Sequence, residues 1–534
     1  MLRKFLIAPA CITVLFYTCA CADSPVPAVQ RDTTITVITA FNELFIDSTY
    51  LDSFLLSQHP YKSYTKQYRD FYTSRNYEFA WFDSSGLAEQ AHNFYNLQNN
   101  YIATSGDSSL YNDPLHQLYD SISAQPIISG LMKQQVLQLE MMLTGQFFRF
   151  AAQQYKGAGI NPAELGWYIP RKKIDLIALL DSVIQNGKDD PEHYIHINRL
   201  YKSLEAELAH YIELEKKEVK QLIPRLKKPV KKGDSSLVVP LVKNRLALLQ
   251  GDLFANNSNR FDADLEEAVK AYQRRNGLSE DGIISNGVID ELNVPLKKRV
   301  QQILVNMERA RWLPVQPGSN FVMVNIPEFK LHVLNKSRQE LEMKVIVGSA
   351  LHNTVIFTAQ LQYIVFSPYW NVPPSITRKE ILPAIRRNSS YLSRNHMEVT
   401  GYVNGLPEIR QKPGEHNSLG LVKFLFPNNY NIYLHDTPGK HLFNQTGRGF
   451  SHGCIRIEEP KKFAEYLLQD EPEYTSEVID SLMHLGKEKW VVLKKTLPVF
   501  LVYFTTWVDQ EGVLNFRKDI YGHDEKMMKK LFNN

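Results

Sequence analysis

Cysteine is scarce in this chain. Four occur in 534 residues, and three of them fall within the first 21 positions: Cys11, Cys19 and Cys21. Cys454 is the only cysteine in the remainder, so a disulfide within that part is excluded. An unpaired thiol in an exported chain is a liability unless it does chemistry. His452, Gly453 and Arg456 around it give an electropositive setting with a glycine turn, which suits a thiolate better than a small buried hydrophobe.

Long hydrophobic runs are also missing. No stretch after the N-terminus reaches the roughly 18 apolar residues that a membrane span needs, and the run Val499–Phe504 has the length of a buried strand. The N-terminus has a basic start, a short apolar run and small residues at positions 20–22, so residues 1–22 are predicted to be a secretory signal. A lipoprotein signal with a lipid on Cys21 is the alternative. The residues before Cys21 fit a lipobox poorly, so cleavage or an uncleaved anchor is favoured.

Strong charge of either sign is absent as well. Lys and Arg number 61 and Asp and Glu 57, which gives a formal net charge of +4. Nucleic-acid binding needs concentrated basic surface, so the composition gives no support for such a partner. The length implies three or four domains.

The first part of the chain has helical periodicity. Apolar residues recur at helical spacing over 131–155, 174–184 and 200–219. The aromatic-rich stretch 71–81 carries no catalytic signature and is interpreted as the core and surface of a helical scaffold. We expect this helical scaffold domain to span residues 23–235.

Residues 236–296 form a compact unit in the sequence. Helices are predicted near 238–249, 262–276 and 286–292, with Gly277 ending the second as a left-handed cap. Phe261, the run 268–273 and Asp281-Gly282 resemble the small three-helix peptidoglycan-binding module. That motif mostly determines the fold and is only a weak indication of glycan binding.

The period changes to that of strands from Phe321 onward. Strand-like segments are 321–326, 330–334, 343–347, 361–366, 421–426 and 431–435, and the tail 490–521 returns to strands. A polar, helix-prone insertion at 373–413 separates two of them, and an insertion of that length is usually functional, for example as a lid. The overall expectation is a multidomain α+β protein with a mostly-β domain over 297–534 and a helical capping insertion.

A cysteine nucleophile needs a base and backbone N–H donors for the oxyanion. His435, at a predicted strand end 19 residues before Cys454, is favoured as the base over His452. Gly453 makes a turn that directs the His452 ring away from the sulfur. The Gly453 and Cys454 N–H groups are candidate oxyanion donors, because glycine lets the backbone approach the substrate.

Two charged residues near Cys454 have open roles. Adjacent strand residues point to opposite faces, so the Asp436 carboxylate is not expected to orient the His435 ring, and a backbone carbonyl is the better candidate. Arg456 is predicted with equal weight to bind a substrate carboxylate or to form a salt bridge that supports the loop.

These residues resemble a known signature. His435-Asp436-Thr437-Pro438, Arg448 and Ser451–Arg456 look like the catalytic signature of L,D-transpeptidases with a YkuD-type domain. The resemblance extends upstream through 306–314, 325–329 and 367–373 and downstream through 506–509 and 519–521. Taken together, these segments are similar to the large Gram-negative subfamily of these enzymes, which has a scaffold domain, a peptidoglycan-binding module and a capping loop.

The resemblance implies a mechanism and a set of site residues. Cys454 would attack the L,D bond of a tetrapeptide stem, His435 would take the thiol proton, and the main-chain carbonyl at Asp436 would orient the histidine. D-Ala would leave, and an amine of a second stem would resolve the acyl-enzyme into a cross-link between third residues. Substrate contacts are expected from Ser451, His452, Arg456, Tyr369, Trp370, Phe443 and Arg448.

Three alternatives remain open at this point. With water as acceptor the same nucleophile would make an L,D-carboxypeptidase, and with a protein lysine it would anchor proteins to the wall. A non-catalytic wall-binding scaffold is disfavoured because Cys454, His435, Gly453 and Arg456 are all intact. No cofactor is expected, and the scattered His residues give no metal-ligand spacing. The expected partners are peptidoglycan stems and wall-synthesis enzymes in the periplasm, with membrane contact only through the N-terminus.

Overall fold

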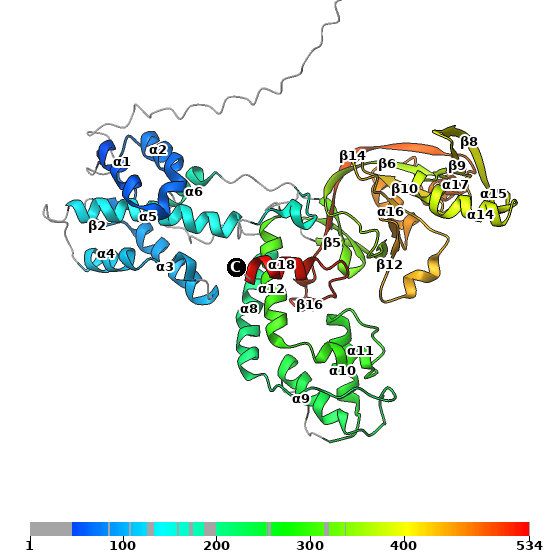
Figure 1. Cartoon of the computed structure of the whole chain (residues 1–534), viewed down its shortest axis with the longest axis horizontal. Helices are drawn as coiled ribbons and strands as arrows, with labels where there is room; N and C mark the ends of the chain where they lie inside the picture. The colour runs from blue at the N-terminus through cyan, green and yellow to red at the C-terminus, as the bar shows by residue number, and fades with distance from the viewer. Residues whose placement is uncertain are drawn as a thin grey trace, which may run out of the picture. The chain divides into compact units, whose positions relative to one another are not determined.

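The computed structural model describes residues 45–83, 86–105, 108–124, 133–156, 160–169, 175–185, 199–251, 254, 258–313, 320–336 and 338–532. The chain forms two compact units, one of Met1–His92 with Asn112–Gln146 and one of Asn93–Tyr111 with Phe147–Asn534. Helices dominate the N-terminal part and strands the C-terminal part, as expected (Figure 1). The predicted signal at residues 1–22 lies outside the described residues. Among the described helices, none combines the length and apolarity that a membrane crossing requires.

The first unit is helical around an aromatic core. Its elements are α1 (Ser48–Ser57), η1 (His59–Tyr64), α2 (Thr65–Ser74), β1 (Phe82–Asp83), β2 (Gly86–Leu87) and α4 (Asp113–Ser123), while α3 (Glu89–Ser105) and α5 (Lys133–Lys156) have residues in both units. The Glu140 carboxylate is buried at its centre and accepts hydrogen bonds from the Tyr72 hydroxyl (2.8 Å), Ala80 N (2.8 Å) and Trp81 N (3.0 Å). The aromatic stretch 71–81 therefore contributes core residues, as interpreted from the sequence.

The second unit begins with helices and contains the three-helix module. It has η2 (Ser108–Leu110), η4 (Pro162–Leu165), α6 (Leu176–Gln185), α8 (Arg199–Lys217), α9 (Val238–Gln250), α10 (Ala263–Arg275), α11 (Asn286–Leu292) and α12 (Leu296–Arg311). The Asp262 side chain caps α10 by accepting from Leu265 N at 3.0 Å, and Gly277 follows its end with φ +63°. The left-handed Gly277 matches the sequence-based expectation, and the Asp262 cap adds a side-chain bond at the other end of the helix.

The module is joined to the rest of this unit by polar contacts. Arg299 of α12 forms an ion pair with Glu291 of α11, and Arg517 donates to the Arg275 carbonyl at 2.9 Å. A cavity of about 540 Å³ lies where α8, the module and α12 meet, and none of the predicted site residues lines it. The predicted division into four parts at 22, 235 and 296 stays a prediction.

The mostly-β part is one nine-stranded sheet. Its strand order is β12-β5-β13-β11-β10-β6-β14-β3-β4, and a further pairing of β4 with β5 closes the ladder on itself. The strands are β3 (Asn320–Asn325), β4 (Lys330–Asn335), β5 (Arg338–Gly348), β6 (Thr358–Phe366), β10 (Val422–Leu425), β11 (Leu434–His435), β12 (Gly449–Ser451), β13 (Ile455–Ile457) and β14 (Lys489–Val502). Short helical elements accompany it: η5 (Ile326–Glu328), η7 (Lys440–Asn444), α16 (Pro460–Leu468) and α17 (Ser476–Met483). α16 packs Phe463 against Phe424 of β10.

The insertion is helical only in its first half. It begins with α13 (Pro374–Ile376), a π-helical turn η6 (Thr377–Ile381), α14 (Leu382–Arg387) and α15 (Tyr391–Arg394). Its second half forms β8 (Met397–Val403) and β9 (Leu406–Gln411), which pair with each other, and β9 also pairs with β7 (Trp370–Asn371). The expectation of a helical insertion is thus corrected for residues 397–411. A small apolar cluster of its own, around Val372, Ile381 and Ile409, holds it together.

Two further differences from the sequence reading have local causes. The strand expected at 431–435 is limited to Leu434–His435, because Asn431 adopts φ +55° and the Asn428 amide binds the Phe426 and Ile432 carbonyls in a loop. The tail forms the hairpin β15 (Thr506–Val508) and β16 (Leu514–Phe516) as expected, and then an additional helix α18 (His523–Phe532).

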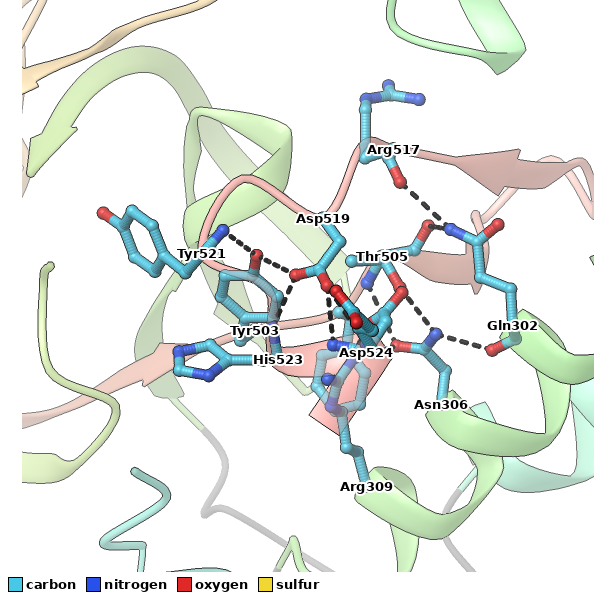
Figure 2. Close-up of polar contacts among 12 residues, drawn as sticks. Gln302, Asn306, Arg309, Tyr503, Thr505, Arg517, Asp519, Tyr521, His523 and Asp524 are labelled. Carbon is cyan, nitrogen blue, oxygen red and sulfur yellow. Dashed lines mark hydrogen bonds and ion pairs between the residues drawn. The ribbon is translucent and has the colours of Figure 1, made fainter. Parts of the chain in front are cut away.

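A buried polar network connects α12 with this C-terminal segment (Figure 2). Asn306 accepts from Thr505 N at 3.0 Å and donates to its hydroxyl at 2.8 Å. Arg309 and Asp524 form an ion pair at 2.6 Å with both side chains at most 6% exposed. Asp519 accepts from the Tyr503 hydroxyl at 2.6 Å and from Asp524 N at 2.8 Å, at the start of α18.

We expect Arg309→Met to lower the free energy of unfolding by about 3–5 kcal/mol, because it leaves the Asp524 carboxyl buried without its cation. Urea unfolding curves of the two proteins measure the difference. The matched control is Arg225→Met, which removes an ion pair to Asp290 whose side chains are 68% and 53% exposed. That change should cost less than about 1 kcal/mol. Equal losses of unfolding free energy in the two variants would contradict a larger contribution from the buried Arg309–Asp524 pair.

Candidate active site

The site is built by the parallel pairing of β11 with β13. Leu434 lies opposite Ile455 and His435 opposite Arg456, and Ile455 N donates to the Tyr433 carbonyl at 3.1 Å. Leu434 and Ile455 are fully buried in the core. Side chains alternate along a strand, so Tyr433, His435, Cys454 and Arg456 lie together on the opposite face.

His435 is held by the backbone of its neighbour. Its Nδ1 lies 2.5 Å from the Asp436 carbonyl oxygen, which can only accept, so Nδ1 carries the proton and Nε2 is left as an acceptor. Burial and the charge of Arg456 lower the pKa of His435 to about 3, against smaller opposing effects from the Asp436 and Leu419 carbonyls. The ring is therefore neutral at pH 7 and able to take up a proton.

Cys454 rests as a thiol. Its Sγ donates to the Asn431 carbonyl at 3.5 Å. Burial raises the pKa of the thiol, while hydrogen bonds with Tyr433 and the charge of Arg456 act in the opposite direction. Because the His435 pKa lies far below that of the thiol, a thiolate–imidazolium pair does not form at rest. The thiolate setting expected from the sequence is met only in part, since burial outweighs the nearby cation.

Arg456 has no counter-ion. Among the described residues its guanidinium makes no hydrogen bond or ion pair, and its Nε is buried without a partner. Burial lowers its pKa, and Cys454 raises it. The salt bridge predicted as one of its two roles is absent from the described part of the chain, and the substrate-carboxylate role stays a prediction.

The turn before Cys454 is shaped by Ser451 and Gly453. Gly453 has φ +117°, in the region that favours glycine. Its N–H donates to the Ser451 Oγ at 3.1 Å, and that hydroxyl donates to the Cys454 carbonyl at 2.5 Å. The Gly453 N–H predicted as an oxyanion donor is thus engaged within the turn. The Cys454 N–H has no partner among the described residues.

The Asp436 carboxylate points away from His435. It accepts from Leu421 N at 2.8 Å and from Lys440 Nζ at 2.6 Å. It also packs on Gly420, where a Cβ would lie 2.3 Å from the carboxylate. Asp436 thus offers its carbonyl to the ring and its carboxylate to the neighbouring loops.

Three further predicted site residues contact the insertion: His452, Trp370 and Tyr369. His452 is half exposed and its Nε2 lies 3.0 Å from the Glu380 carboxylate on η6, so it links the loop to the insertion. Trp370 packs against the apolar cluster of the insertion, and the Arg410 guanidinium lies 4.2 Å above the Tyr369 ring. Their substrate contacts stay predictions.

Phe443 and Arg448 are both buried. Among the described residues, the hydrogen bonds of Arg448 go to backbone carbonyls: Val345 at 3.1 Å, Gln445 at 2.8 Å and Phe329 at 2.8 Å. Its guanidinium also lies 5.3 Å from the centre of the Phe329 ring. These bonds hold the segment before β12 against β5. A substrate contact by either residue stays a prediction.

Two residues at the site were not found from the sequence. Tyr433 bonds to the Cys454 sulfur, and its only signal was its position two residues before His435. Thr354 donates its hydroxyl to the Gly453 carbonyl at 2.8 Å from a loop 99 positions away, for which the sequence gives no signal.

Comparisons with known families match three parts of the chain. Residues 319–483 match the family model of the L,D-transpeptidase catalytic domain (YkuD), residues 66–217 a "Scaffold domain", and residues 237–292 a "Putative peptidoglycan binding domain". By these matches the chain carries a YkuD-type L,D-transpeptidase catalytic domain, and the resemblance drawn from the sequence is confirmed.

Individual proteins similar to this chain are also named as L,D-transpeptidases. A protein of Haemophilus influenzae named "Putative L,D-transpeptidase" is 31% identical over 243 residues, which is 42% of this chain. The chain spans about half (49%) of the length of that relative. Crystal structures of L,D-transpeptidases from Stackebrandtia nassauensis and Mycobacterium smegmatis are each 13% identical, with TM-scores of 0.22 and 0.20. The first match covers 51% of this chain and 94% of the other, and the second 34% and 58%.

Arg456→Met should move the pH profile of Cys454 alkylation upward by about one unit or more, because it removes the cation that stabilises the thiolate. Arg456→Lys, which keeps a charge, is the control. Peptide mass spectrometry after timed iodoacetamide treatment gives the rate at Cys454. In the wild type the rate should still rise above pH 8.5, with no step near pH 6.5, the ordinary range of histidine. Identical profiles for Arg456→Met and the wild type would contradict this electrostatic role.

Proposed function

We propose that this protein is a peptidoglycan L,D-transpeptidase with Cys454 as nucleophile and His435 as general base. The observation that carries it is the shared sheet face of Cys454 and His435 within a region that matches the L,D-transpeptidase catalytic domain. The Asp436 carbonyl, which holds the proton on His435 Nδ1, and the turn at Gly453 support these two roles.

The reaction starts from a neutral thiol and a neutral imidazole. As Cys454 Sγ bonds to the carbonyl carbon between the third stem residue and D-Ala, its proton moves to His435 Nε2. The carbonyl electrons shift to oxygen, and the oxyanion is stabilised by backbone N–H groups. The C–N bond then breaks, and D-Ala leaves with the proton from His435. An amine of a second stem attacks the thioester, gives its proton to His435 and forms the cross-link, and Cys454 regains a proton.

Arg456 is proposed to bind a carboxylate of the donor stem. A half-buried guanidinium without a counter-ion is costly, and an anionic substrate supplies the missing partner. Bound there, the carboxylate lies on the same face as the thiol. The insertion at 373–413 is proposed to cap the bound stem, with His452–Glu380 as its contact to the catalytic loop.

Location follows from the substrate. A peptidoglycan-binding match and a transpeptidase domain suggest work at the cell wall or in the periplasm. Attachment to the membrane, by an anchor or a lipid on Cys21, is part of the proposal.

A carbapenem should form a covalent adduct with Cys454, because its strained β-lactam carbonyl presents the same electrophile to the thiol. Intact mass should increase by the mass of the whole drug, since ring opening loses no atoms. Cys454→Ala should show no adduct. His435→Gln keeps the thiol but lacks the base, so its adduct should form about 10²–10⁴-fold more slowly. An adduct that forms equally in Cys454→Ala would contradict the nucleophile.

Purified tetrapeptide muropeptides test the acceptor. We expect the wild type to release D-Ala and to form a dimer, and Cys454→Ala to do neither, as measured by mass spectrometry of the products. Loss of D-Ala with only a tripeptide product would replace the proposal by an L,D-carboxypeptidase. Absence of turnover with both proteins would favour the non-catalytic scaffold.

A further inference from the structure

In the peptide unit between Gly453 and Cys454, the carbonyl has a hydrogen-bond partner among the described residues and the N–H has none. The Gly453 carbonyl accepts from the Thr354 hydroxyl at 2.8 Å. The N–H of the same peptide belongs to Cys454 and has no partner among the described residues. The Cys454 N–H, a donor left for a ligand, is therefore on a peptide whose orientation Thr354 controls.

The direction of the Thr354 hydroxyl is determined by its partners. Thr354 is 1% exposed, so water does not compete for it. Gly348 N–H donates to Oγ1 at 2.9 Å, which occupies the oxygen as an acceptor. The single hydroxyl proton is thus directed at the Gly453 carbonyl, which can only accept.

Because the peptide unit is planar, the hydrogen bond from Thr354 to the Gly453 carbonyl also determines the direction of the Cys454 N–H. A trans peptide unit is rigid, and its C=O and N–H point in opposite directions. Holding the Gly453 oxygen against Thr354 therefore aims the Cys454 N–H away from the protein interior. Gly453 alone would not fix this direction, because glycine at φ +117° has neighbouring conformations of similar energy.

Thr354 is itself held by the C-terminal segment. Its N–H donates to the Tyr521 hydroxyl at 3.3 Å, and that hydroxyl donates to the Gly348 carbonyl at 2.7 Å. Tyr521 N–H in turn donates to the Tyr503 hydroxyl at 2.9 Å, within the network of Figure 2. Gly348 has no room for a side chain, since a Cβ would lie 2.0 Å from the His352 carbonyl oxygen.

We propose that Thr354 is a positioning residue of the oxyanion site, which sets the direction of the Cys454 N–H through the Gly453 carbonyl, with Tyr521 supporting it. This assignment rests on the proposed function, because it concerns the attack of Cys454 on a carbonyl. During that attack the S–C bond forms, the carbonyl electrons move to oxygen, and the thiol proton goes to His435. The Cys454 N–H then donates to the new oxyanion. Alkylation of the same thiol forms no oxyanion and does not need this donor.

The test compares two reactions of Cys454 in the full chain. Thr354→Val keeps the shape and removes the hydroxyl, and Thr354→Ser restores it. Acylation by a carbapenem is followed by intact mass, and alkylation by iodoacetamide by peptide mass spectrometry. The matched control is Thr358→Val, which removes a threonine hydroxyl bonded to the Val499 carbonyl at 3.1 Å in the same sheet.

We expect acylation of Thr354→Val to be slower by about 10- to 100-fold, since misaimed donors at oxyanion sites cost rates of this order. Its alkylation should stay within about twofold of the wild type. Thr354→Ser should recover most of the acylation rate, Tyr521→Phe should lose less than Thr354→Val, and Thr358→Val should match the wild type.

The outcomes separate this assignment from the proposed function. Equal acylation of Thr354→Val and the wild type would overturn the role of Thr354 and leave the nucleophile intact. Parallel losses of acylation and alkylation would overturn it too, because they indicate a structural effect on the thiol. Failure of the wild type to be acylated at all would instead contradict the proposed function.

Discussion

The parallel pairing of β11 with β13 is the constraint on which the site depends. It buries Leu434 and Ile455 in the core and thereby sends Tyr433, His435, Cys454 and Arg456 to the other face. A slip of one residue in either strand would exchange the two sets and put the thiol or the imidazole into the core. The apolar pair is thus as important for the chemistry as the polar residues, because its burial fixes the register.

Burial on this face also sets the protonation states. Both the thiol and the imidazole are driven to their neutral forms. The charge of Arg456 lowers the pKa of each, and Lys440 has a smaller effect of the same sign on the imidazole. The same charge therefore favours the thiolate and disfavours the imidazolium. A bound carboxylate at Arg456 would reduce both effects and make His435 a better base when substrate is present. The counter-ion that the described chain lacks would then be supplied only by the molecule on which the site acts.

The sequence indicated the fold class, the helices of the module and the residues proposed to react, because each has a local pattern. Cys454 and His435 stand in a short motif, and the second helix of the module is bounded by Asp262 and Gly277. What it did not indicate depends on contacts between distant segments or on backbone detail. Thr354 meets Gly453 across 99 positions, and the strand expected from Asn431 is interrupted by side chain–backbone bonds of Asn428. The effect of burial on the Cys454 thiol, which raises its pKa against the charge of Arg456, was not indicated either, because charge patterns along a sequence do not report desolvation.

The network of Figure 2 is a costly way to join α12 to the C-terminal segment, because each buried polar group loses its hydration. An apolar contact of similar volume would give comparable stability but would leave positions less narrowly defined. Hydrogen bonds restrict both distance and direction, and the chain of contacts from Asp519 through Tyr503 and Tyr521 leads to the loop that holds Gly453. A catalytic peptide must keep its direction to within a fraction of an ångström, whereas stability needs only burial. The physical reason for a polar network here is therefore the accurate direction of the peptide at Gly453 more than stability.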